Sequence, residues 1–80
     1  MTDPAHVYLL RCADGTLYCG CTTDVARRVG EHQEGTASRY TRSRLPVALA
    51  WSKGMASRGD ALREEHRIKR LSRADKLRLM

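Results

Sequence analysis

Apolar residues in the first part of the chain form two short runs that predict a β-hairpin. Residues 6–12 (HVYLLRC) and 17–21 (LYCGC) are rich in residues that favour strands. The runs are separated by Ala-Asp-Gly-Thr, and an Asp-Gly pair between apolar runs is a strong hairpin signal. Gly20 indicates either a bend in the second strand or a close approach of another group to its backbone. The hairpin places Tyr8 and Tyr18 on paired strands.

A short helix is predicted directly after the hairpin, over residues 25–32. The preceding residues 22–24 (TTD) have side-chain oxygens that can accept hydrogen bonds from the first helical turn. At about 100° per residue, Arg28 and His32 fall on the same side as the two valines of the helix. We therefore expect Arg28 and His32 to face the interior, whereas Arg27 lies on the opposite side and is solvated.

The remainder of the chain predicts one more strand and two more helices. Residues 35–45 (GTASRYTRSRL) are polar and end before a proline, which predicts a basic surface loop with partial helical character. Residues 47–51 (VALAW) predict a third short strand. Ser-Arg-Gly-Asp and Ser-Arg-Ala-Asp are cap patterns, the first for a helix over residues 60–71 and the second for a final helix. This order predicts an α/β (α+β) fold, in which helices flank a small, mainly antiparallel three-stranded sheet.

Size and composition indicate one compact unit. A chain of 80 residues can enclose only one modest core, so we expect a single domain over residues 1–80. It has neither an apolar run long enough to cross a bilayer nor a secretion signal, so we expect a cytoplasmic protein without a membrane partner. Its three cysteines suit a reducing compartment, since Cys19 and Cys21 are too close for an easy mutual disulfide. A zinc site lacks the usual second ligand pair, which favours buried thiols.

Basic residues are concentrated in the second half of the chain. The formal net charge is +6, and residues 36–80 carry twelve basic and four acidic residues, whereas residues 1–35 carry three basic and five acidic ones. A positive field attracts nucleic acid, but a solvated helix face has the same composition. Charge alone therefore favours a nucleic-acid partner only slightly.

Four segments together resemble the GIY-YIG superfamily of nucleases. They are VYLL at residues 7–10, YCG at 18–20, an Arg-x-x-x-His pair at 28–32 and ALREEHRIK at 61–69. Their joint order and spacing is specific, and the similarity covers nearly the whole chain. It is closest to a small stand-alone bacterial subfamily, and related domains occur in the excision-repair incision subunit and in the catalytic subunit of a eukaryotic structure-specific endonuclease. The chain departs from the family in lacking the glycine and isoleucine of the first motif, and Cys21 stands where some relatives have lysine.

The resemblance implies a divalent-metal-dependent endonuclease that hydrolyses phosphodiester bonds in nucleic acid, with Mg²⁺ or Mn²⁺ as the metal. Family precedent points to DNA, including branched or flap structures, and to DNA repair. Two other classes remain open. One is a nucleic-acid-binding module that keeps the fold without much activity, and the other is a subunit that needs a protein partner. The oligomeric state is not indicated by the sequence.

A set of five catalytic residues is also implied by the resemblance: Tyr8, Tyr18, Arg28, His32 and Glu65. Glu65 would be the metal ligand, since Mg²⁺ beside a phosphate is commonly held by one carboxylate and several waters. Arg28 would bind phosphate oxygens, with an ion pair to a buried carboxylate such as Glu65 as the structural alternative. Tyr8 would orient or deprotonate the attacking water and Tyr18 would position phosphate or share the proton relay, with packing across the sheet as the alternative. His32 is an alternative base or a partner of Tyr8.

Two adjacent carboxylates compete for the metal-binding role. Glu64 and Glu65 lie about 100° apart on one helix and cannot point the same way. Family spacing selects Glu65, and the helical wheel leans the same way without deciding. Because apolar residues flank Glu65 on its helix face, we expect it to lack an ionic partner until a cation binds.

A nucleic-acid-binding surface is expected to combine cations that follow a phosphate backbone with an aromatic ring that stacks on a base. The residues expected to form it are Arg39, Tyr40, Arg42, Arg44 and Lys69. These residues would determine affinity and substrate geometry rather than the chemical step.

Overall fold

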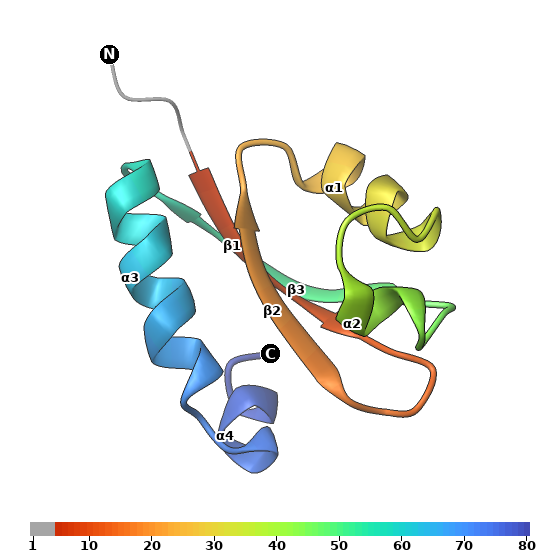
Figure 1. Cartoon of the computed structure of the whole chain (residues 1–80). Coiled ribbons are helices and arrows are strands. Elements are labelled where there is room, and N and C mark those ends of the chain that lie inside the picture. The colour runs from red at the N-terminus through yellow and green to blue at the C-terminus, as the bar shows by residue number, and fades with distance from the viewer. Residues whose placement is uncertain (1–4) are drawn as a thin grey trace.

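The computed structural model describes residues 5–80, which form a three-stranded sheet with helices on both faces (Figure 1). The α+β class predicted from the sequence is confirmed. In chain order the elements are β1 (Ala5–Arg11), β2 (Leu17–Thr22), α1 (Val25–Gln33), α2 (Arg39–Arg42), β3 (Ala48–Met55), α3 (Arg58–Lys69) and α4 (Arg73–Leu77).

The sheet is antiparallel throughout, with the strand order β2-β1-β3. The β1–β2 hairpin turns at the predicted Asp-Gly pair, where Gly15 has a φ of 84° that residues with a side chain rarely adopt. In this register Tyr8 lies directly opposite Gly20. Because β1 is the central strand, β2 forms one edge of the sheet.

Helix α3 covers one face of the sheet, and α1 and α2 cover the other (Figure 1). Successive side chains of β1 point alternately to the two faces, so each face has its own core. Beneath α3 the buried cluster consists of Val7, Leu9, Cys19 and Ile68. On the opposite face it consists of Tyr8, Leu10, Cys12 and Val47.

The helices begin at the capping residues that the sequence predicts. Asp24, Ser57 and Ser72 each accept a hydrogen bond from the backbone N–H three residues later, at the starts of α1, α3 and α4. The boundaries of most elements differ from the prediction by a few residues. Helix α3 begins at residue 58, since its capping group is the serine of the Ser-Arg-Gly-Asp pattern, and β3 extends to residue 55 because pairing with β1 continues beyond the apolar run.

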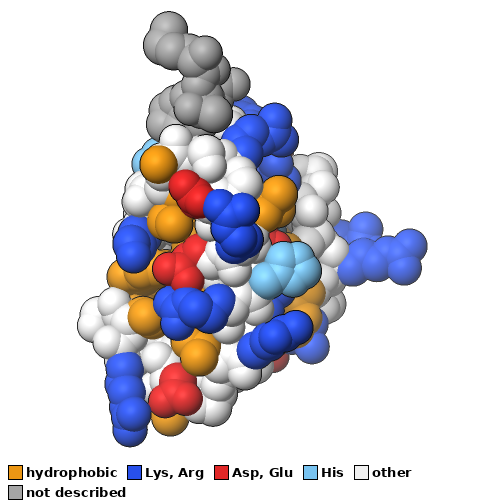
Figure 2. All heavy atoms as spheres, turned by 90° about the vertical axis from the view of Figure 1, so that its left-hand side faces the viewer, with side chains coloured by type: hydrophobic (Ala, Val, Ile, Leu, Met, Phe, Trp, Pro, Cys, Tyr) orange, Lys and Arg blue, Asp and Glu red, His pale blue; other side chains and the backbone are white. Residues whose placement is uncertain are grey.

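The face formed by α3 carries basic side chains mixed with acidic and apolar ones (Figure 2). Arg63, Arg67 and Lys69 each pair with a carboxylate of the same helix. Part of the positive charge of the second half of the chain is therefore compensated locally. Within residues 5–80, neither this helix nor any other is long and apolar enough to cross a membrane.

Candidate active site

Three buried side chains form a hydrogen-bonded chain between β1, α1 and α2. The hydroxyl of Tyr8 lies 2.8 Å from Nε2 of His32, and Nδ1 of His32 lies 2.8 Å from Oγ1 of Thr41. Tyr8, His32 and Thr41 are 2%, 1% and 0% exposed. Since an unpaired polar group at such depth would destabilise the fold, these contacts also fix the three side chains in place. The expectation that His32 faces the interior is confirmed.

The hydroxyl of Thr41 indicates which nitrogen of His32 carries the proton. Thr41 Oγ1 lies 3.0 Å from the hydroxyl oxygen and 3.4 Å from the carbonyl oxygen of Ser38, and its proton can be donated to either of them. Its oxygen then accepts a hydrogen bond from Nδ1–H of His32. Nε2 of His32 then accepts a hydrogen bond from the Tyr8 hydroxyl, so each of the three side chains has an acceptor for its proton.

Gly20 makes room for the hydroxyl end of Tyr8. A Cβ atom at Gly20 would lie 2.5 Å from the Tyr8 hydroxyl oxygen and 2.7 Å from the ring carbon that bears it. These distances are shorter than any normal non-bonded contact, so a side chain at this position would displace Tyr8. Of the two roles that the sequence left open for Gly20, the structure supports the close approach.

Burial disfavours the charged forms of both Tyr8 and His32. It raises the pKa of Tyr8 above its ordinary value of 10.0; Tyr18 raises the pKa further, and Arg28 partly offsets the increase. Burial also lowers the pKa of His32 below 6.5, and the positive charge of Arg28 adds to this effect. At neutral pH the pair is therefore a protonated phenol beside a neutral imidazole.

The ring of Tyr18 contacts both His32 and Tyr40. Its centroid lies 5.2 Å from that of His32 in an edge arrangement and 5.8 Å from that of Tyr40 in a stacked one. The guanidinium of Arg44 lies 3.8 Å from the Tyr40 ring centroid and is held by an ion pair of 3.0 Å to Asp14. Tyr40 of α2 thus packs on Tyr18, and Arg44, which follows α2, packs on Tyr40. A direct nucleic-acid contact of these two residues stays a prediction.

Arg27 and Arg28 share a single carboxylate. Nε of Arg28 lies 3.3 Å from Oε1 of Glu31, and Nη1 of Arg27 lies 3.2 Å from Oε2 of the same residue. The ionic partner of Arg28 is therefore Glu31, which corrects the alternative pairing with Glu65. Nε of Arg28 is shielded from solvent but lacks hydrogen-bond geometry to its neighbour. Arg27 is exposed as expected and Arg28 is half-buried, although both side chains reach the same carboxylate.

The two carboxylates of α3 lie beside different strands. Glu64 pairs with Arg67 and, at 3.7 Å, with Lys53 of β3. Glu65 lies on the β2 side, where burial of the Cys21 thiol and the neighbouring Glu65 carboxylate raise the pKa of Cys21 to about 11. The carboxylate of Glu65 also lies 3.1 Å from Nζ of Lys69, and its side chain is 16% exposed. The expectation that Glu65 lacks an ionic partner is therefore wrong.

The side chains around Glu65 offer a divalent cation few protein ligands. Within residues 5–80, no group of three or more histidine, cysteine or acidic side chains could hold a metal ion. The three cysteines are free thiols, as expected. One carboxylate at the edge of the sheet fits a hydrated Mg²⁺ or Mn²⁺ that takes its other ligands from water and phosphate, and it does not fit a closed zinc site.

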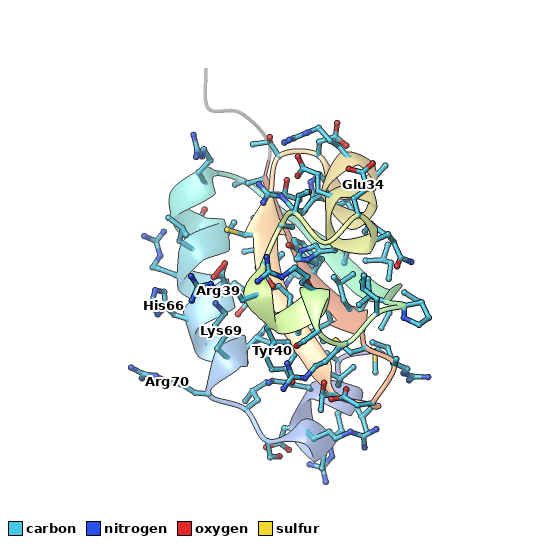
Figure 3. All side chains as sticks on the ribbon, turned by 45° about the vertical axis from the view of Figure 1, so that its right-hand side comes forward. Glu34, Arg39, Tyr40, His66, Lys69 and Arg70 are labelled. Carbon is cyan, nitrogen blue, oxygen red and sulfur yellow. The ribbon has the colours of Figure 1, made fainter. Side chains whose placement is uncertain are left out.

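Basic residues of α2 and α3 lie on one side of the molecule, around β2. Figure 3 shows Arg39 and Tyr40 on α2, and Lys69 on α3. Among residues 5–80, no carboxylate pairs with Arg39 or Arg42, and both are exposed. Lys69, by contrast, is engaged by Glu65. Arg39 and Arg42 are therefore the members of the predicted binding surface that have no competing partner in this part of the chain.

Sequence reasoning missed Thr41 and Glu31. Nothing in the local pattern separates Thr41 from the other hydroxyl residues of its segment. The available signal was the Ser38-x-x-Thr41 spacing, since Ser38 caps α2 and so turns Thr41 inward. Glu31 looked like an ordinary exposed helix residue, and only the structure shows that both neighbouring arginines pair with it.

Comparison with known proteins identifies the family. The model of the GIY-YIG catalytic domain matches residues 4–78. A UPF0213 protein of Halobacterium salinarum is 54% identical over 71 residues (89% of this chain, 92% of that protein), and one of Streptococcus agalactiae is 49% identical over 74 residues (92% and 84%). The solution NMR structure of the UPF0213 protein BH0048 from Bacillus halodurans is similar with a TM-score of 0.61 and 42% identity, covering 95% of this chain and 81% of that one. The chain therefore belongs to the GIY-YIG family of catalytic domains, a nuclease family.

Proposed function

We propose that the protein is a divalent-metal-dependent endonuclease acting on DNA, with its active centre where the β1–β2 hairpin meets α1 and α3. The observation that carries the proposal is the buried chain from Tyr8 through His32 to Thr41. Tyr8 and His32 form an acid–base pair, and the charges of both Arg28 and Glu65 act on the Tyr8 phenol. Few structural roles require a buried, fully hydrogen-bonded imidazole beside a phenol and a guanidinium.

In the proposed reaction Tyr8 and His32 act as a two-step proton relay. The raised pKa of Tyr8 argues against a free phenolate, so Tyr8 takes a proton from the attacking water only as its own proton passes to Nε2 of His32. The water oxygen then forms a bond to phosphorus, and the bond to the leaving oxygen breaks. The neutral state of His32 at pH 7 leaves it ready to accept that proton.

Arg28 and Glu65 deal with the charge of the phosphate. The planar guanidinium of Arg28 binds phosphoryl oxygens and stabilises the negative charge that builds up in the transition state. Glu65 is the metal ligand, and a divalent ion bound there would supply further positive charge to the phosphate. Lys69 pairs with Glu65 in the structure, so a divalent ion bound at Glu65 would compete with Lys69 for the carboxylate and would free the lysine for the phosphate backbone. Tyr18 positions the phosphate beside the relay.

The runner-up is a nucleic-acid-binding module without activity, and the ion pair between Glu65 and Lys69 is the observation that favours it. The lysine already compensates the charge of the carboxylate, so the fold does not require a cation at this position. The two functions differ in one measurable respect: only the nuclease should cleave nucleic acid when a divalent ion is added.

The test is a cleavage assay on labelled single-stranded, duplex, flap and branched DNA, and on matching RNA, with Mg²⁺, Mn²⁺ or chelator. Glu65→Gln should abolish cleavage and weaken the response of the protein to Mn²⁺, whereas Glu64→Gln, its neighbour beside β3, should cleave at the wild-type rate. Loss of cleavage in the Glu64 variant alone would assign the ligand to Glu64. Binding of DNA by the wild type without cleavage in any metal would favour the binding module.

A further inference from the structure

A cavity of about 310 Å³ lies between the first turns of α1 and α3, at the end of β2. Arg27 and Arg28 line it from α1, and Arg58 lines it from the first residue of α3. Among residues 5–80, the rest of the wall is uncharged, comprising Ala5, Cys21, Thr22, Thr23, Ala61 and Leu62. Three arginine residues from two separate helices thus line one cavity.

The charges around this cavity are unbalanced. Glu31 is the only carboxylate paired with Arg27 and Arg28 within residues 5–80, and it is shared between them. In the same part of the chain, no carboxylate pairs with Arg58. Arg28 also has a shielded Nε without a hydrogen-bond acceptor. An anion with several oxygens would satisfy these donors and offset the excess positive charge.

The cavity adjoins the proposed active centre. Arg28 belongs to both, and Cys21 lines the cavity while the Glu65 carboxylate acts on the pKa of its thiol. Ala61, in the cavity wall, precedes Glu65 by four residues of α3, which is about 6 Å along the helix. A group in the cavity would therefore lie beside a phosphate held at Glu65, on the side of the α3 amino terminus.

We infer that this cavity binds a second phosphate of the nucleic-acid strand, next to the one that is cleaved, with Arg27 and Arg58 as its ligands. The inference rests on the proposed function for the identity of the ligand, because the chemistry of the cavity by itself specifies only an oxyanion. Two phosphates held at neighbouring points fix the direction of the strand across β2. Arg58 then positions the substrate without taking part in the chemical step.

The test uses the full chain, a fluorescent single-stranded DNA oligonucleotide and chelator, so that binding is measured without cleavage. Arg58→Ala should weaken binding severalfold and reduce the slope of log K against log salt by about 0.7, the contribution of one phosphate on a single strand. Arg63→Ala is the matched control, since Arg63 lies on the same helix, is 75% exposed and pairs with Asp60 away from the cavity. A third variant, Thr23→Glu, places a negative charge in the cavity wall and should weaken binding at least as much as Arg58→Ala.

A parallel NMR titration with inorganic phosphate and with the oligonucleotide separates a strand phosphate from a free one. We expect the amides of residues 22–23 and 58–61 to shift with both, at much lower concentrations of the oligonucleotide. Shifts with inorganic phosphate but no binding of the oligonucleotide would overturn the assignment to a nucleic-acid strand. Equal binding and equal salt slopes in the Arg58 and Arg63 variants would overturn the inference and leave the nuclease proposal intact. A reduced salt slope in the Arg58 variant, together with a wild-type protein that cleaves none of the substrates, would support the phosphate site and count against the nuclease.

Discussion

The two faces of the sheet are built differently, although both receive alternate side chains of the same central strand. The face beneath α3 holds Val7, Leu9 and Ile68, each 0% exposed, in an apolar cluster. The face beneath α1 holds Tyr8 and, from the helices above, the buried polar residues His32 and Thr41. Apolar packing is non-directional and depends mainly on area, whereas buried polar groups need specific partners.

This difference separates apolar packing from buried hydrogen bonding within a very small protein. Glu65, on α3, joins the proposed active centre from the edge of the sheet at β2. On the α3 face any well-fitting apolar residue can contribute to the core. On the α1 face each polar atom must be matched, and the result is a set of groups held at defined distances. The comparison leads to four predictions, which begin with the largest expected effect.

Removing the hydroxyl of Tyr8 should affect cleavage far more than folding. Tyr8→Phe leaves the ring beside Gly20 and the apolar cluster but removes the hydrogen bond to His32. The cleavage rate should fall by about 10²- to 10⁴-fold, the range for general acid–base groups, while the free energy of unfolding changes by about 1 kcal/mol. Single-turnover cleavage and urea unfolding would measure the two effects, and a cleavage rate within threefold of wild type would exclude Tyr8 from the relay.

Truncating the apolar face should have the opposite profile. Ile68→Ala removes a fully buried side chain beneath α3 and should reduce the free energy of unfolding by about 2–5 kcal/mol. Leu62→Ala on the same helix is the comparison, because Leu62 is 50% exposed and its loss should cost far less. At a temperature where the Ile68 variant is folded, its cleavage rate per folded molecule should stay close to that of wild type. A catalytic defect comparable to that of the Tyr8 variant would show that the two faces do not have different roles.

Because of the imidazole of His32, both the cleavage rate and the free energy of unfolding should change with pH in the mildly acidic range. Burial and Arg28 lower the pKa of folded His32 below 6.5, whereas the unfolded chain keeps the ordinary value, so the unfolded state binds more protons between the two values. The stabilising contribution of neutral His32 is therefore complete above pH 6.5 and is lost as the pH falls toward the folded pKa. Cleavage should decline over the same range, since protonated His32 cannot accept the proton of Tyr8. A pH profile of His32→Gln that keeps the same acid limb would assign that limb to another group.

The smallest effect is expected at the outer rim of the α1 face. Arg39→Ala with Arg42→Ala removes two exposed cations and should reduce the salt slope of single-stranded DNA binding by about 1.4. Cleavage at saturating substrate should remain mostly intact, because neither residue contacts the relay. An unchanged slope would remove α2 from the binding surface.

Local patterns in the sequence determined much of the architecture. The Asp-Gly turn, the capping residues Asp24, Ser57 and Ser72, and the apolar runs of the strands act between near neighbours, so they can be read from the chain. The helical wheel likewise predicted that His32 faces inward, because the spacing between His32 and the valines of α1 is local information. Joint spacing of the tyrosines with Arg28, His32 and Glu65 was sufficient to indicate the family.

Contacts between distant segments were decided only by the tertiary structure. The wheel could not choose between Glu64 and Glu65, but packing of α3 sets the first beside Lys53 of β3 and the second beside Cys21 of β2. In the same way, Thr41 reaches His32 only because α2 folds back over the sheet, and Lys69 turned out to be the partner of Glu65. Arg58 joins Arg27 and Arg28 around one cavity although thirty residues of chain separate them. Such contacts depend on how whole elements pack, which no short-range pattern encodes.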